Sequence, residues 1–414
     1  MQDKIANEAQ AVLEQVNNEH CGFSEAAWFT QEIMQRFQVK NLKNEKPELI
    51  ILGEDFPPEL ALAVCDDPYF LLGGSLEATH WSDSLLPRDA DPVSRSACGW
   101  LLNKHFHLAE DALIVLTLTN DNRRKLAGLL QGQGLQVLPI DLPPIYQSEQ
   151  AKSSWVDEML RATREMAAYC YSRITVRSLV RSIMETQRLR QAILSFQKTV
   201  LKTPACMSPT LRGIILESVY YTENRTEWLR HLQRLTGQII TWQRRYYVPQ
   251  DIRPWVLTVG SPVMFPNEKL PMLLESSGLF LASRVDPLSI QPEMPTPSVR
   301  RFDTLRDLLM RMAAERLPKE VSGAWTVNYG LLDAVQHRLD HMPIDGIVYH
   351  VLKGQIEYDF ELSQVEKIAS EYGVPVFRLE TDYQQQDVEQ LRIRMEAFSE
   401  MLQQRNSERI RIAQ

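Results

Sequence analysis

Residues 345–362 read DGIVYHVLKGQIEYDFEL, and residues 373–383 read GVPVFRLETDY. Each stretch contains a short apolar, β-branched run, at residues 347–352 and 374–379, which is typical of a strand buried in a parallel sheet. Between the two runs, residues 360–372 place their apolar side chains on one stripe, which indicates a helix. The order of strand, loop, helix and strand predicts an α/β fold with a parallel sheet.

The loops that follow these two strands are predicted to form a binding site. In open α/β sheets, ligands bind beyond the carboxyl ends of the strands. The side chains in these loops that are candidates for the pocket are Lys353, Glu380, Asp382 and Tyr383. In a structural alternative, Glu380 and Asp382 cap the next helix and Lys353 pairs with them.

Similar patterns in the rest of the chain predict two sheets separated by helices. The strands expected in the first sheet are residues 49–52, 67–72, 112–119 and 135–140, and the second sheet begins with residues 255–259 and 278–283. The fold class is therefore α/β, with two parallel-sheet domains of flavodoxin-like or Rossmann-like type and an intervening helical segment. The expected segments are N-terminal helices at 1–45, a first α/β domain at 46–150, a helical insert at 151–250 and a second α/β domain at 251–414.

The expected helical insert is rich in arginine and in aromatic residues, which include Trp228, Trp242, Tyr246 and Tyr247. Such a surface suits an anionic CoA moiety, but a solvated helix face produces the same pattern. Both interpretations stay open on the sequence alone.

The composition excludes some classes of protein. The 414 residues are 44% hydrophobic and carry a formal net charge of -8, and the sequence pI is near 5.6. We expect no nucleic-acid partner, because a nucleic-acid-binding domain would show a basic patch or stripe. The sequence has no run of about 18 apolar residues and no signal-peptide core at its N-terminus, so we expect no membrane partner and a cytoplasmic location.

The cysteines are scattered along the chain, at Cys21, Cys65, Cys98, Cys170 and Cys206. Their odd number and the lack of C-x-x-C spacing argue against a disulfide framework or a local zinc site. We predict no metal ligands and expect small buried side chains instead. A cluster assembled from distant cysteines stays open, and Cys98 is the candidate for it.

Several motifs carry a resemblance to a known family. The C-terminal run joins DGI, VLKG and GVPVFRLETDY to DVEQLRIRMEAF at residues 387–398, and the N-terminal part contains LGEDFPPEL at 52–60 and DPYFLLGGS at 67–75. This pattern, from about Leu49 to Leu402, resembles the 2-hydroxyacyl-CoA dehydratase family of D-component type, whose relatives include benzoyl-CoA reductase subunits. The resemblance implies two α/β domains, an acyl-CoA ligand and a place in anaerobic metabolism.

In that family three cysteines hold a [4Fe-4S] cluster, and the resemblance places the matching positions at Asp91, Asn120 and Gln355. Iron–sulfur clusters are held by cysteine thiolates, so one carboxylate and two amides are poor ligands. The same resemblance implies that the pocket includes four further residues, which are Ser75, Asp121, Lys125 and Ser261. It assigns no catalytic residue in this chain.

Three alternatives are compatible with these replacements. In the first, the chain has lost its cluster and is the structural or regulatory partner of a homologous cluster-bearing subunit. In the second, it is an active [4Fe-4S] acyl-CoA dehydratase or reductase subunit that uses other ligands. In the third, it is a stand-alone metabolite-binding protein.

The resemblance also implies partners and chemistry. It implies a heterodimer with the cluster-bearing homologue, or a homodimer, together with an ATP-dependent activator. We therefore expect no cofactor in this chain and a [4Fe-4S] cluster on the partner. An active form would be a 2-hydroxyacyl-CoA dehydratase-like lyase or a component of an acyl-CoA reductase.

Overall fold

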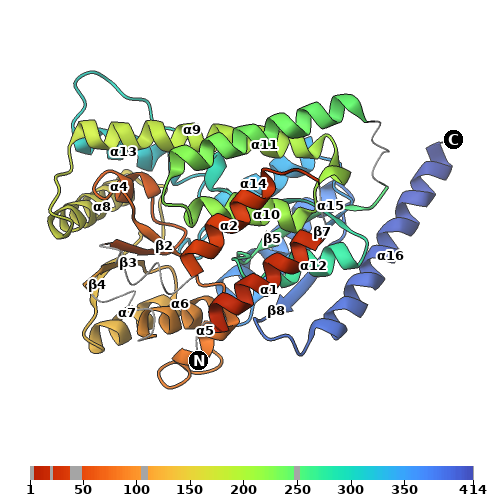
Figure 1. The fold of residues 1–414 in the computed structure, drawn as a ribbon, viewed down its shortest axis with the longest axis horizontal. Coiled ribbons are helices and arrows are strands. Elements are labelled where there is room, and N and C mark those ends of the chain that lie inside the picture. The colour runs from red at the N-terminus through yellow and green to blue at the C-terminus, as the bar shows by residue number, and fades with distance from the viewer. Residues whose placement is uncertain (1–3, 19–21, 38–48, 104–110, 247–251, 414) are drawn as a thin grey trace.

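The structure is a computed structural model that describes residues 4–18, 22–37, 49–103, 111–246 and 252–413. Cys21 and Tyr247 lie outside these ranges. The chain begins with two helices, α1 (Lys4–Asn18) and α2 (Ala26–Phe37). It then forms two separate sheets joined by a helical segment, as Figure 1 shows.

The first sheet has four parallel strands in the order β2-β1-β3-β4. They are β1 (Leu49–Leu52), β2 (Tyr69–Leu71), β3 (Leu113–Thr117) and β4 (Gln136–Ile140). The helices around this sheet are α4 (Pro58–Leu62), α5 (Leu76–Ser82), α6 (Pro92–Leu102) and α7 (Asp121–Gly132). In β1, Leu49 and Ile51 join one hydrophobic cluster while Ile50 and Leu52 join another, because successive side chains point to opposite faces. Burial on both faces explains why the sequence shows a continuous apolar run.

The second sheet repeats this arrangement, in the order β6-β5-β7-β8. Its strands are β5 (Trp255–Gly260), β6 (Phe280–Val285), β7 (Gly346–Leu352) and β8 (Val376–Thr381). The helices that accompany it are α12 (Lys269–Ser276), α13 (Leu305–Arg316), α14 (Tyr329–His341), α15 (Leu362–Glu371) and α16 (Val388–Ala413). The two four-stranded parallel sheets confirm the predicted fold class.

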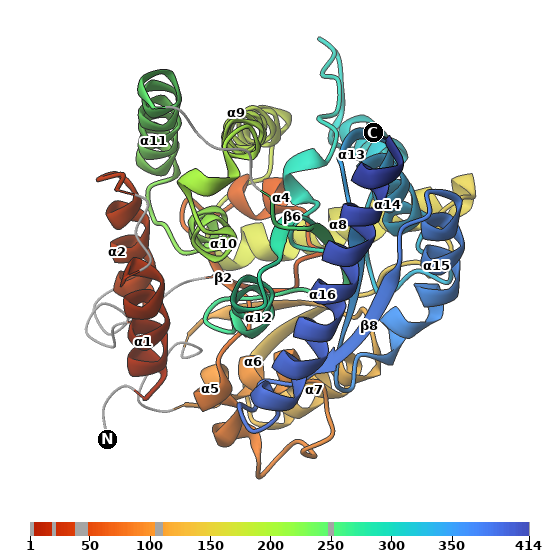
Figure 2. The same cartoon turned by 90° about the vertical axis from the view of Figure 1, so that its right-hand side faces the viewer.

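Helices cover both faces of the second sheet. Val256 and Val348 pack with Phe398 of α16, whereas Leu257 and Ile347 pack on the opposite face with side chains of α14 and α15. Figure 2 shows α14 and α15 on one side of the molecule and α1, α2 and α11 on the other. The helix expected from residue 360 begins at Leu362, because a 3-10 helix, η4 (Ile356–Glu361), comes first.

The helical segment consists of α8 (Glu149–Tyr169), α9 (Val176–Leu201), α10 (Pro209–Glu217) and α11 (Arg225–Arg245). Each begins after a polar residue whose side-chain oxygen accepts a backbone N–H of the first turn, and these residues are Ser148, Thr175, Ser208 and Asn224. Figure 1 shows α9 and α11 side by side along one edge of the molecule. Within the residues described above, none of the helices combines the length and apolar character that crossing a membrane requires.

The loops at the carboxyl ends of the two sheets contact each other. A Cβ atom on Gly74, after β2, would lie 2.1 Å from the carbonyl oxygen of Met264 and 2.4 Å from that of Phe265, after β5. The hydroxyl of Tyr383, after β8, donates to the carbonyl of Gly73 over 2.9 Å. Loops that follow strands of both sheets therefore meet at one interface.

Candidate functional site

Asp91 lies at this interface and is the residue that caps the N-terminus of α6. Its side chain is 0% exposed, and its Oδ1 accepts hydrogen bonds from the backbone N–H groups of Val93 at 3.0 Å and Ser94 at 3.1 Å. Pro92 suits the first helical position, because the missing N–H has no partner there in any case. A carboxylate at a helix N-terminus is also stabilised by the helix dipole.

Gln355, in the loop after β7, reaches Asp91 from the second sheet. Its Nε2 donates to Asp91 Oδ1 over 3.2 Å, and the side chain is 5% exposed. Gly354 has a φ of +87°, and a Cβ atom there would lie 2.9 Å from the Asp91 nitrogen. Glycine thus permits the close approach of the two loops. Within the described chain, Asp91 Oδ2 and Gln355 Oε1 have no hydrogen-bond partner.

Asn120 begins α7 and links the same loops. Its Oδ1 accepts from the backbone N–H of Arg123 at 2.9 Å, and its Nδ2 donates to Glu357 Oε1 over 2.6 Å. Asn122 adds a hydrogen bond from Nδ2 to the carbonyl of Gly354 at 3.2 Å. We call Asp91, Asn120, Gln355 and Glu357 the loop cluster.

Glu357 was not expected from the sequence. Burial raises the pKa of its carboxyl to about 7, the hydrogen bond from Asn120 opposes this shift, and the nearby Asp91 adds to it. Arg123 lies close enough to lower the pKa slightly and is itself paired with Glu54 over 3.4 Å. The one feature of the sequence that could have indicated Glu357 is its position two residues after Gln355 in the loop.

Protonation of Glu357 should make stability depend on pH. Below pH 4.5 the carboxyl is protonated in both states, and between 4.5 and about 7 only the folded state keeps the proton. Folding therefore becomes less favourable as pH rises through this window, by up to about 3 kcal/mol for a shift of this size.

We expect Glu357→Gln to flatten this part of the pH profile, because the amide does not titrate. Urea denaturation of both proteins between about pH 4.5 and pH 8 measures the effect. Glu361, whose pKa is also raised to about 7 by burial, stays in both proteins, so it contributes equally to both profiles and the difference between them reports Glu357 alone. Parallel profiles for wild type and Glu357→Gln would show that Glu357 does not hold the extra proton.

Comparison with known proteins identifies the family. The model of the family "2-hydroxyglutaryl-CoA dehydratase, D-component" matches residues 55–402. This chain belongs to that D-component family. It is 23% identical over 359 residues to YjiM of Escherichia coli (strain K12), described as a dehydratase subunit, covering 84% of this chain and 89% of that protein. It is 22% identical over 270 residues to the (R)-phenyllactyl-CoA dehydratase beta subunit of Clostridium sporogenes, covering 65% and 69%.

Three of the other candidates hold the loops of this D-component chain in place. Ser75 Oγ accepts from the backbone of Ala78 at 3.0 Å as the cap of α5 and donates to Glu8 over 2.5 Å. Ser261 Oγ accepts from the backbone N–H of Leu352 at 2.9 Å. Tyr383 is buried, with the hydrogen bond to Gly73 given above. Their polar atoms are engaged within the chain.

The remaining candidates lie at or near the surface. Asp121 and Lys125 are exposed on α7. Lys353 pairs with Asp89 over 3.4 Å, and Glu380 pairs with Arg378 over 3.1 Å. The structural alternative, in which Lys353 pairs with Glu380 and Asp382 at the start of the next helix, is wrong, because Lys353 pairs with Asp89 instead.

Asp382 is held by Lys269, a lysine that no sequence motif indicates. Lys269, buried on α12, donates to the Asp382 carbonyl at 3.2 Å and to Asp387 Oδ1 at 2.5 Å. The Asp382 carboxylate accepts from the backbone of Gln384 at 2.8 Å and closes a turn instead of capping α16. This lysine therefore fixes the segment between β8 and α16.

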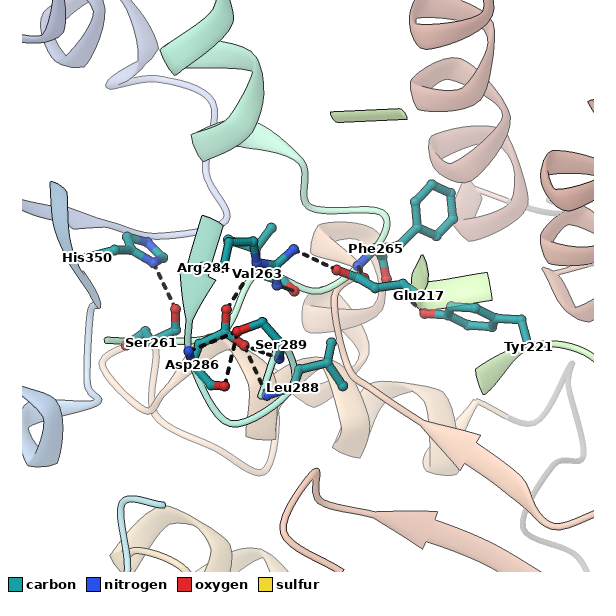
Figure 3. A network of polar contacts seen from close by, with 10 residues as sticks. All are labelled: Glu217, Tyr221, Ser261, Val263, Phe265, Arg284, Asp286, Leu288, Ser289 and His350. Atoms are coloured by element: carbon teal, nitrogen blue, oxygen red, sulfur yellow. Dashed lines mark hydrogen bonds and ion pairs between the residues drawn. The ribbon is translucent and has the colours of Figure 1, made fainter. Parts of the chain in front are cut away.

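A second polar network, which the sequence did not indicate, connects the helical segment to the second sheet (Figure 3). Arg284 at the end of β6 pairs with Glu217 of α10 over 2.9 Å and with Asp286 over 3.0 Å. The ring of His350 lies between the Ser261 carbonyl at 3.1 Å and the Thr381 hydroxyl at 2.8 Å. Burial lowers the pKa of His350 to about 4, so this ring is neutral at pH 7.

Proposed function

We propose that this chain is a cluster-free subunit of a D-component dehydratase assembly and serves as structural or regulatory partner of a homologous cluster-bearing subunit. The observation that carries the proposal is the loop cluster. Asp91 and Gln355 are hydrogen-bonded to each other, and Asn120 is bonded to Glu357, two residues beyond Gln355. The three positions that the family resemblance assigns to cluster ligands are thus close together and carry no sulfur.

The side chains at these positions do not fit an iron–sulfur cluster. Such clusters require thiolates, and here the donors are carboxylate and amide groups. Asp91 Oδ1 and Asn120 Oδ1 are already engaged as caps of α6 and α7. The nearest cysteine along the chain is Cys98, a residue of α6 that is 0% exposed in the core, and burial raises the pKa of its thiol to about 11. A neutral buried thiol is a poor substitute ligand.

The loop cluster instead has a structural role in this proposal. Asp91 and Asn120 come from the first sheet, whereas Gln355 and Glu357 come from the second. Their hydrogen bonds join the two sheets directly. In a cluster-bearing homologue, thiolates at the matching positions would bind the iron–sulfur cluster instead. The subunit therefore keeps a fixed interface without a cofactor, and a relative described as a beta subunit is consistent with assembly into a larger enzyme.

Anaerobic purification of this chain alone, of a cluster-bearing homologue alone and of the two co-expressed tests the proposal. We expect the isolated chain to be colourless and the co-expressed pair to elute as one complex, with visible cluster absorbance equal to that of the homologue. Cluster absorbance from the isolated chain would favour the alternative of an active subunit with other ligands. A colourless chain that forms no complex would favour a stand-alone binding protein.

A further inference from the structure

A cavity with a volume of 740 Å³ lies between the helical segment and the second sheet. Its walls come mainly from α9, α10 and the edge strand β6, which lie next to one another in Figure 2. Among its lining residues there is no member of the loop cluster. Any ligand held here would therefore bind apart from that cluster.

The cavity has the size and the apolar walls of a ligand site. Side chains of Phe70, Leu189, Ile193, Leu216 and Leu281 line it. Sites for small organic molecules typically enclose about 300–1,000 Å³.

The charged side chains around this cavity are unbalanced. Two lysines and five arginines line it, against two glutamates. Two of the buried arginines are neutralised: Arg190 pairs with Glu59 at 2.6 Å, and Arg284 pairs with Glu217 at 2.9 Å. A third, Arg338, pairs with Glu293.

The other two arginines, Arg212 and Arg225, form no ion pair among the described residues. Carboxylates act on them only from beyond ion-pair distance, namely Glu275 on Arg212, and Asp67 and Glu185 on Arg225. Arg225 is 6% exposed, its guanidinium lies 5.7 Å from the centre of the Phe70 ring, and its Nη2 has no hydrogen-bond partner among the described residues. Arg212 is 8% exposed and donates to the carbonyls of Leu281 and Ala282. Buried charges are ordinarily paired, and neither of these two guanidinium groups forms an ion pair.

A glycine keeps the cavity open. Gly213 lines it from the middle of α10, where glycine costs about 1 kcal/mol relative to alanine. A Cβ atom there would meet only Arg284 Nη1, at an ordinary contact distance of 3.6 Å. A Cβ atom at this position would thus fit without a clash.

We propose that this cavity binds an amphipathic carboxylate, such as a medium-chain carboxylic acid, with its carboxylate on Arg225 and its alkyl chain between α9, α10 and β6. Arg212 is a second buried arginine among the lining residues. The apolar lining residues account for the alkyl chain of the ligand, and the unpaired guanidinium of Arg225 accounts for its carboxylate. This site is independent of the subunit role proposed above.

Calorimetric titration of the full chain with decanoate, below its micelle concentration, tests the proposal. We expect saturable binding of decanoate and markedly weaker binding of butyrate, which lacks the chain, and of decanol, which lacks the charge. Arg225→Met should weaken decanoate binding about tenfold or more, since a charge-assisted hydrogen bond is lost. Its melting temperature should be equal or higher, because a buried charge without a partner is removed.

Gly213→Leu provides a second variant that does not depend on Arg225. The leucine should extend into the space proposed for the alkyl chain and weaken decanoate binding markedly, while the melting temperature is kept or raised. Gly237→Leu is the matched control, since Gly237 is an exposed glycine of α11 that does not line the cavity, and a Cβ atom there would have no heavy atom within 4 Å. Failure of the wild type to bind decanoate, equal binding of decanol, or unchanged binding in Gly213→Leu would each overturn the proposal.

Discussion

Replacing Gly74 with alanine should destabilise the whole chain, by about 3 kcal/mol, the upper end of the cost of overpacking. The new Cβ atom would lie 2.1 Å from the carbonyl oxygen of Met264 and 2.4 Å from that of Phe265. These are backbone atoms of the second sheet's first loop, so relief requires the two sheets to separate. Urea denaturation, followed by circular dichroism, measures the loss.

Gly128→Ala is the matched control for this substitution. Gly128 lies in α7 with no heavy atom within 4 Å of the position of a Cβ atom. Alanine there should stabilise the protein by about 0.5–1 kcal/mol through helix propensity alone. Equal stability of Gly74→Ala and wild type would show that the two loops are not in contact.

Arg284→Met should cost about 3–5 kcal/mol, the usual effect of removing one partner from a buried ion pair. The substitution leaves the carboxylates of Glu217 and Asp286 buried without their cation (Figure 3). Glu268 lies in the same region, is 2% exposed, and has a pKa raised well above its ordinary value, chiefly by burial and then by Glu217. Arg284 is the cation that offsets both effects.

The loss in Arg284→Met should also depend on pH. Lower pH should reduce the deficit relative to wild type, because protonation neutralises the carboxyls that have lost their partner. Arg124→Met is the control, since Arg124 pairs with Asp141 at the surface and such pairs contribute no more than about 1 kcal/mol. A deficit as small as that of Arg124→Met would mean that Arg284 does not stabilise the network.

The fold could be predicted because the inner strands β1, β3 and β7 are buried along their whole length. Residues 49–52 and 347–352 read as unbroken apolar runs for this reason, and the structure has strands at Leu49–Leu52 and Gly346–Leu352. The start of the helix after Gln355 was less clear, since a 3-10 turn precedes α15 and its residues do not follow the helical period. The division of the chain into four segments stays a prediction.

The site could be predicted only in part. The family resemblance, and not the strand pattern, drew attention to Asp91, Asn120 and Gln355, and the strand pattern placed Asn120 and Gln355 in loops after strands, where ligands of α/β sheets bind. Their assignment as former cluster ligands stays a prediction. Glu357, Lys269 and Arg284 were missed, because their roles depend on contacts between residues far apart in the sequence, such as Arg284 with Glu217. No local pattern reports such a contact.

The central claim is tested most directly by iron and acid-labile sulfide analysis of the isolated chain after anaerobic reconstitution with iron and sulfide. The comparison is a variant that carries Asp91→Cys, Asn120→Cys and Gln355→Cys together, which supplies three thiolates at the loop cluster. We predict no bound iron or sulfide in the wild type and partial incorporation in the variant. About four iron atoms and four sulfides per wild-type chain would contradict the claim that this subunit holds no cluster.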